Sequence, residues 1–221
     1  MSALDHYQSP STSAKYASTS SLTRVLIASL AVYAGLEFFA VLMNVLLLAT
    51  NGAIAETGGL LLATAAVGIG GGLMLANMGL WLLWQAQAAR TAWQWNNDAT
   101  PMEHGPVTAL IWWFVPVANL VKPFRVVREI WTTTATHLQD SSLPKPPLAA
   151  WWGLCLAALV SESLALWMDV FGHFTASQMV GIFANALGVS AAAAAALLVK
   201  RIDDAQVQVA HEKGVASFDR R

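Results

Sequence analysis

Residues 112–131 read WWFVPVANLVKPFRVVREIW, and the character of this stretch changes in its middle. The first half is apolar apart from Asn119 and is interrupted by Pro116, whereas the second half carries one lysine and two arginines. The apolar run 107–121 has only 15 residues, fewer than the roughly 20 that a helix needs to cross a bilayer. Proline inside a helix also removes a hydrogen-bond donor and crowds the preceding turn. The stretch therefore predicts a re-entrant or interfacial segment that enters a bilayer and turns back.

The composition is typical of a membrane protein. The 221 residues are 56% hydrophobic and 11% charged, and the mean hydropathy is +0.52. A soluble domain carries about a quarter charged residues, so lipid is the expected solvent for much of this surface. The formal net charge of -1 argues against a nucleic-acid partner. The single cysteine, Cys155, excludes a disulfide within the chain and predicts no metal cluster.

Four long apolar runs predict an all-α integral membrane protein with four transmembrane helices. The expected spans are about 25–50, 60–84, 149–168 and 176–199; the first contains Glu37, the third contains Glu162, and the others contain no charge. A signal peptide cleaved after Ala55 is an alternative for the first run. That run is far longer than the roughly 7–15 residues of a signal core, so an uncleaved span is expected.

The basic residues predict the orientation. With four crossings, all 12 lysines and arginines fall on one side, and the two loops on the other side, 51–59 and 169–175, contain none. Cytoplasmic loops are enriched in such residues. We therefore expect both termini in the cytoplasm. A fifth crossing at 107–121 would place Lys200 and Arg201 outside, against this rule.

An amphipathic helix is expected after the break. Asn119 is a candidate N-cap, and Pro123 would lie in the first turn. Phe124, Val127, Ile130 and Trp131 share one side at helical spacing. The cations on the other side are Lys122, Arg125 and Arg128. Such a helix either anchors the chain at the interface or recognises anionic lipid headgroups or another membrane protein.

The order of residues around this segment carries a family resemblance. The matching residues are Trp84, Thr100-Pro101, Trp113-Phe114-Val115-Pro116, Asn119-Leu120, Pro123, Arg128-Glu129 and Trp131. This order resembles the bacterial membrane family called domain of unknown function 4328. The family pattern has Ser-Pro-Gly where this chain has Thr100-Pro101 without the glycine, and it often has an aromatic residue where this chain has Val121. The resemblance implies a polytopic bacterial membrane protein and no particular activity.

The expected organisation is a disordered cytoplasmic tail (1–23), a membrane domain (24–202) with its re-entrant or interfacial segment at 106–138, and a cytoplasmic tail (203–221). The residues that define the signature segment are Trp112, Trp113, Pro116, Asn119, Pro123, Arg128 and Trp131. Two ridges of small residues predict close helix contacts: Thr64, Gly68, Gly72 and Ala76 in the second span, and Ala184, Gly188, Ala192 and Ala196 in the fourth. The Gly68–Gly72 ridge is alternatively the seam of a homo-oligomer.

Two carboxylates inside predicted spans are the main candidates for chemistry. Glu37 is 13 residues after Arg24, about 20 Å along a helix and near mid-membrane. Glu162, Asn44 and Asn185 are expected in the outer half, so a polar cluster of all four residues is possible. A charged group at such a depth costs about 2.5 kcal/mol or more unless it is paired, hydrated or protonated. The cluster either holds a proton or small cation or, as neutral hydrogen-bonded groups, fixes helix register.

No catalytic constellation is visible. The histidines are dispersed, and a metal site formed by His104, His137 and Glu103 is less expected than solvated loop histidines. No nucleophile–base pair has a recognisable context, so we expect no enzyme, no metal and no cofactor. An enzyme that acts on lipid is a third possibility, and it has the least support. Two functions remain. The first is a non-enzymatic sensor, scaffold or partner-binding subunit; the second is a small proton or cation transporter, or a conducting oligomer, that uses Glu37 and Glu162.

Overall fold

The structure is a computed structural model that describes residues 20–50, 53, 60–95, 101–139 and 143–213. Every regular element in this described part is helical. The elements are α1 (Ser20–Ala49), α2 (Leu60–Gln94), α3 (Thr108–Ile111), a 3₁₀ helix η2 (Ala118–Leu120), α4 (Lys122–Ala135), α5 (Leu148–Val170) and α6 (Phe174–Glu212). The predicted all-α class is therefore confirmed.

Among the residues that the structure describes, three helices are long and apolar enough to cross a bilayer: Ser21–Ala49, Leu148–Val170 and Phe174–Glu212. Their side chains explain this assignment. Phe38 is 57% exposed, Leu164 46% and Phe183 60%, as expected for helices whose apolar faces contact lipid instead of a protein core. The chain is accordingly a membrane protein. The predicted second span, 60–84, lies within the 35-residue helix α2.

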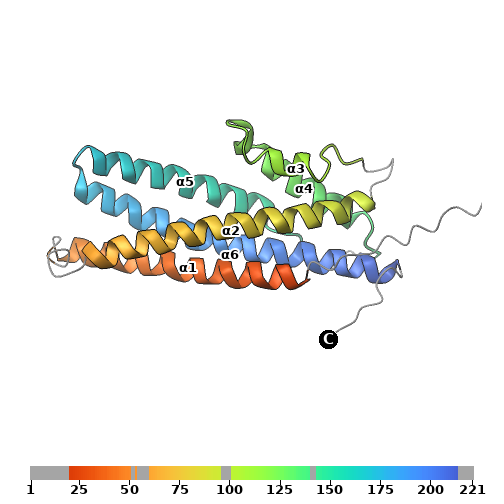
Figure 1. Cartoon of the computed structure of the whole chain (residues 1–221), viewed down its shortest axis with the longest axis horizontal. Coiled ribbons are helices and arrows are strands. Elements are labelled where there is room, and N and C mark those ends of the chain that lie inside the picture. The colour runs from red at the N-terminus through yellow and green to blue at the C-terminus, as the bar shows by residue number, and fades with distance from the viewer. Residues whose placement is uncertain (1–19, 51–52, 54–59, 96–100, 140–142, 214–221) are drawn as a thin grey trace, which may run out of the picture.

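The long helices lie side by side along the longest dimension of the molecule (Figure 1). α6 packs along both α1 and α5, and α2 packs chiefly on α1. The first residues of α1 and the last residues of α2 and α6 lie at the same end, where α3 and α4 are added on one side (Figure 1). We call this end the cap and define it as residues 81–95, 101–139 and 198–212. The opposite part, residues 37–49, 60–72, 159–170 and 174–188, is the distal half.

Helices α2 and α6 continue well past their predicted spans. α2 ends at Gln94 and α6 at Glu212, so the boundary expected at residue 202 lies within α6. Ile202, Ala205 and Val209 are fully buried and follow a helical spacing that places them on one face. This polar-looking extension of α6 is therefore part of the core. Most of the expected tail 1–23 lies outside the described residues, and α1 begins at Ser20.

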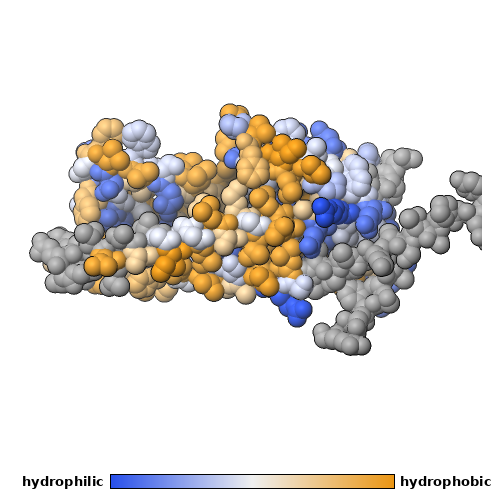
Figure 2. All heavy atoms as spheres, viewed as in Figure 1, coloured by the Kyte–Doolittle hydropathy of each residue, from blue (hydrophilic) through white to orange (hydrophobic). Residues whose placement is uncertain are grey.

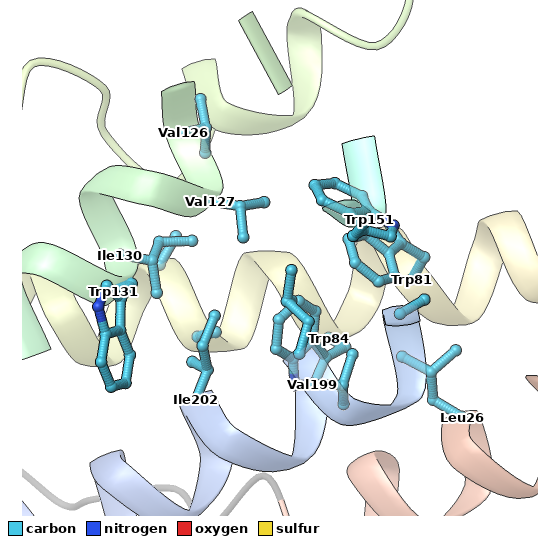
Figure 3. Close-up of a cluster of buried hydrophobic side chains, with 14 of the residues drawn as sticks. Leu26, Trp81, Trp84, Val126, Val127, Ile130, Trp131, Trp151, Val199 and Ile202 are labelled. Carbon is cyan, nitrogen blue, oxygen red and sulfur yellow. The ribbon is translucent and has the colours of Figure 1, made fainter. Parts of the chain in front are cut away.

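The hydrophobic core lies in the cap. Trp84, Val127 and Ile202 are completely buried, and Figure 3 shows side chains of α2, α4 and α6 meeting around Trp84. Trp81 stacks on Trp151 of α5 with ring centroids 4.9 Å apart. By contrast, hydrophobic atoms cover much of the surface along the middle of the bundle in Figure 2. The cap thus resembles a soluble protein in its packing, whereas the distal half is built for lipid.

The signature segment forms short pieces. α3 has four residues and η2 has three, so neither is long enough to cross a bilayer as a helix. Val117, the residue after Pro116, has φ 66, a conformation that a β-branched residue rarely adopts. α4 begins at Lys122 after the N-cap residue Val121, which makes no side-chain cap bond. The predicted Asn119 cap is wrong, because this amide instead donates to the Trp113 carbonyl at 3.4 Å, whereas Pro123 does lie in the first turn.

Helix α4 is amphipathic as predicted, but its apolar face contacts protein. Val126, Val127 and Ile130 are completely buried, and α4 packs against α2, α5 and α6. An interfacial helix would lay this face on the bilayer. The extensions of α2 and α6 provide a protein surface there instead, which the sequence did not indicate.

The two ridges of small residues behave differently. On α6, Ala184 and Ala192 are buried, and a Cβ placed on Gly188 would lie 3.2 Å from Glu37 Cδ of α1. This ridge therefore allows α1 to approach closely, as predicted. On α2, a Cβ at Gly68 or Gly72 would meet no atom within 4 Å, so this ridge makes no close helix contact within the described part of the chain.

Candidate functional site

One glutamine connects the tryptophans of the cap. Gln85 is completely buried, and its Oε1 accepts hydrogen bonds from the indole N–H groups of Trp81 at 3.0 Å and Trp113 at 2.9 Å. Its amide nitrogen donates to the Ala109 carbonyl at 3.1 Å. Trp152 of α5 donates to the Leu120 carbonyl at 3.0 Å. Buried polar groups of this kind are costly when unpaired, so these bonds fix the signature segment on α2 and α5.

A second group of polar side chains contacts the signature segment on its other side. His104 is 3% exposed, and its Nδ1 lies 2.8 Å from Glu129 Oε1. Lys122 Nζ lies 3.2 Å from His104 Nε2, 3.9 Å from Glu103 Oε1, and 4.9 Å above the Trp112 ring. A carboxylate accepts and an ammonium donates, so the imidazole must carry its proton on Nδ1 and accept at Nε2. We call Glu103, His104, Lys122 and Glu129 the clamp. These residues connect positions 103–104 to the first turns of α4.

The clamp contains donor atoms that suit a metal ion. Ligand atoms of Glu103, His104 and Glu129 lie within 4.8 Å of one another, and imidazole and carboxylate are common zinc ligands. However, Nε2 of His104 accepts from Lys122, whose ammonium already supplies a positive charge 3.9 Å from Glu103. The arrangement is therefore complete as an ion and hydrogen-bond network. The prediction of a solvated loop histidine is wrong for His104, and His137 is half-buried and 2.7 Å from the Trp95 carbonyl.

The outward side of the signature segment carries two kinds of exposed group. At its tip, Phe114 is 66% and Val117 80% exposed, and hydrophobic atoms cover the tip in Figure 2. The tip of the segment therefore does not pack against the bundle. On α4, Arg125 and Arg128 are also exposed, opposite the buried face, whereas Lys122 is turned into the clamp.

The two intramembrane glutamates are near each other. Glu37 is half-buried on α1 and forms a side-chain hydrogen bond with Tyr33, one turn earlier on the same helix. Glu162 of α5 is exposed and interacts electrostatically with Glu37. Gly188 of α6 lies directly against the Glu37 carboxylate. Hydrophilic residues lie in a hollow between α5 and α2 toward the left of Figure 2, so this part of the bundle is not uniformly apolar.

The predicted asparagines are less closely connected to these glutamates. Asn44 donates to the Ala40 carbonyl of its own helix at 2.8 Å, and its side chain lies beside Gly181 of α6. Asn185 is half-buried on α6. Among the described residues, no hydrogen bond joins either asparagine to a glutamate. The structure thus brings together two of the four predicted residues and adds Tyr33.

Sequence reasoning missed Tyr33, Gln85 and the His104–Glu129 pair. Tyr33 and Glu37 are four residues apart, a spacing that brings side chains together on a helix, so that signal was available. Gln85 directly follows the predicted span 60–84, but Gln87 comes two residues later, so the sequence does not single out Gln85. His104 and Glu129 are 25 residues apart, and no local pattern indicates their contact.

Comparison with protein families agrees with the resemblance of the signature segment. The family model described as Domain of unknown function (DUF4328) matches residues 48–204, which include α2 to α5 and most of α6. No curated protein and no solved structure matches the chain. Because the match covers well over half of the 221 residues, the chain belongs to the DUF4328 family.

Proposed function

We propose that the chain is a four-span protein of the bacterial inner membrane with both termini in the cytoplasm. The fourth crossing would be α2, whose residues 60–84 carry no charge. The one-sided distribution of all 12 basic residues supports this orientation. The cap would then lie at the cytoplasmic face, and the apolar tip at Phe114 and Val117 would enter the inner leaflet as a re-entrant wedge.

The function that this geometry supports best is that of a non-enzymatic partner-binding subunit. The observation that carries it is the rigid presentation of Arg125 and Arg128. Their helix is fixed by three completely buried side chains, and no carboxylate of the described residues forms an ion pair with either guanidinium. Guanidinium groups bind carboxylates in a defined bidentate geometry. The cap therefore offers two preoriented cations to an acidic surface of a membrane-associated protein.

The test is site-specific photo-crosslinking in cells from Thr132, which is exposed on α4. We expect a discrete crosslinked protein that is reduced at least about tenfold by R125E/R128E, because like charges across an interface are strongly unfavourable. The matched control is K145E/K200E, which reverses the same number of exposed cations elsewhere on the protein. Membrane levels of all variants should be equal. An unchanged crosslink in R125E/R128E would contradict partner binding through this face.

A second candidate function is proton or cation movement. The interaction of Glu37 with Glu162 favours it, since neighbouring carboxylates at membrane depth can share a proton or a cation. The test is flux into liposomes that contain the purified protein. We expect E37Q and E162Q each to reduce flux at least about tenfold, whereas N44A, beside Gly181, should leave it within about twofold. Absence of flux in the parent protein, or flux in both glutamine variants equal to that of the parent, would end this candidate.

A further inference from the structure

A groove runs along the side of α2 next to α3. It has a volume of about 440 Å³, and Gly79, Leu82, Leu83, Ala86, Gln87 and Arg90 of α2 and Leu110 of α3 line it. Gly79 contributes no side chain, and nothing lies within 4 Å of where its Cβ would stand. Leu83 is 59% exposed. The groove is thus apolar from Gly79 to Ala86 and ends in the polar side chains of Gln87 and Arg90.

The position of this groove matches the boundary of the bilayer. Gly79 lies within the expected span 60–84, about 8 Å from Trp84 along the helix, and Arg90 lies about 9 Å beyond Trp84 on the cap side. The headgroup layer is about 5–8 Å thick on each face. A long arginine side chain can reach back into that layer while its stem stays on apolar surface. The groove therefore extends from hydrocarbon to headgroup depth, as a phospholipid molecule does.

The charge at the end of the groove selects among lipids. Arg90 is exposed, and among the residues that the structure describes it forms no ion pair. A guanidinium without a carboxylate partner at headgroup depth attracts a negatively charged phosphate. We propose that this groove binds one anionic phospholipid, with an acyl chain along Gly79 and Leu83 and the phosphate at Arg90. This site is separate from the partner surface at Arg125 and Arg128, but it rests on the proposed crossing by α2.

The experiment is native mass spectrometry of the purified full chain released from detergent after addition of dioleoyl phosphatidylglycerol or dioleoyl phosphatidylcholine. We expect one tightly retained phosphatidylglycerol, favoured over phosphatidylcholine by about fivefold, the contribution of one cation near a membrane surface. R90Q should abolish the preference, and R90K should keep most of it. K145Q, which removes a cation outside the groove, should leave the preference unchanged.

The matched pair G79L and G72L tests the apolar part of the site. Both glycines are exposed on α2, seven residues apart, with no atom within 4 Å of an added Cβ. G79L fills the groove and should lower retention of both lipids about tenfold, whereas G72L should retain them as the parent does. Equal effects of the two variants, a preference that survives R90Q, or no preference in the parent protein would each overturn the proposal.

A cysteine at residue 79 tests whether α2 crosses the bilayer, independently of whether the groove binds lipid. In a Cys155→Ala background, Gly79→Cys should resist a water-soluble maleimide, because the position lies in hydrocarbon. Labelling at the rate of a free thiol would contradict both the crossing by α2 and the lipid site. If the thiol is protected but the native spectra of the parent protein show no preference for phosphatidylglycerol over phosphatidylcholine, the lipid site alone is contradicted.

Discussion

The cap and the distal half use the same helices in different ways. In the cap, Trp84, Gln85 and Ile202 are completely buried, and α2, α4, α5 and α6 meet there. In the distal half, Leu61 is 78% and Leu166 64% exposed. Lipid provides no hydrophobic drive between helices, so contacts there depend on close backbone approach, as at Gly188. Most of the stabilisation by the hydrophobic effect should therefore come from the cap.

The largest expected effect comes from the centre of the cap. Trp84→Ala removes a completely buried ring and should cost about 3–5 kcal/mol. Phe38→Ala is the control, because Phe38 is 57% exposed on α1 and contacts lipid. Thermal unfolding in detergent measures both variants. Equal destabilisation by the two substitutions would contradict the difference between the cap and the distal half.

The next effect concerns the hydrogen bonds of Gln85. Gln85→Met keeps the approximate volume but leaves the indole N–H groups of Trp81 and Trp113 without their acceptor. Each unpaired buried donor costs about 1–3 kcal/mol, so we expect a loss of about 2–4 kcal/mol and a change in near-UV circular dichroism of the tryptophans. Gln87→Met, two residues along the same helix and only half-buried, should have little effect on either measurement. Unchanged stability in Gln85→Met would show that these bonds do not hold the signature segment.

The smallest effect tests close packing in the distal half. Gly188→Leu would push against the Glu37 carboxylate, since even a Cβ would lie 3.2 Å from its Cδ, and overpacking typically costs about 1–3 kcal/mol. A Cβ added at Gly68 would meet no atom within 4 Å, so Gly68→Leu should change stability by less than about 0.5 kcal/mol. Thermal unfolding in detergent measures both variants, and the ratio of their midpoint shifts compares how tightly the chain packs around Gly188 and around Gly68. A large loss in Gly68→Leu would instead reveal a contact of α2 with a second copy.

The sequence predicted which residues form helices better than it predicted which helices pack against one another. Charge and hydropathy locate α1, α5 and α6 because a bilayer imposes the same length on every crossing helix. The ends of α2 and α6 were missed because they continue beyond the apolar runs as ordinary amphipathic helices, with buried positions such as Ala205 and Val209 among polar residues. The apolar face of α4 was identified, but the surface that it covers depends on those missed extensions.

The candidate site was predicted in the same uneven way. Glu37 and Glu162 were found because a carboxylate in an apolar run is conspicuous. Which helix faces lie together cannot be read from periodicity when a helix is apolar on all sides, so Asn44 and Asn185 were placed by depth alone. The contact between His104 and Glu129 depends on the path of residues 101–106 back to α4, which no local spacing specifies.

The length of α6 has a mechanical consequence. Its 39 residues form one rod of about 58 Å that touches Glu37 through Gly188 and enters the cap through Ile202 and Gln206, whose amide donates to the Ala88 carbonyl. A displacement of α6 at the level of Glu37 would therefore also move the part of α6 against which α4 packs.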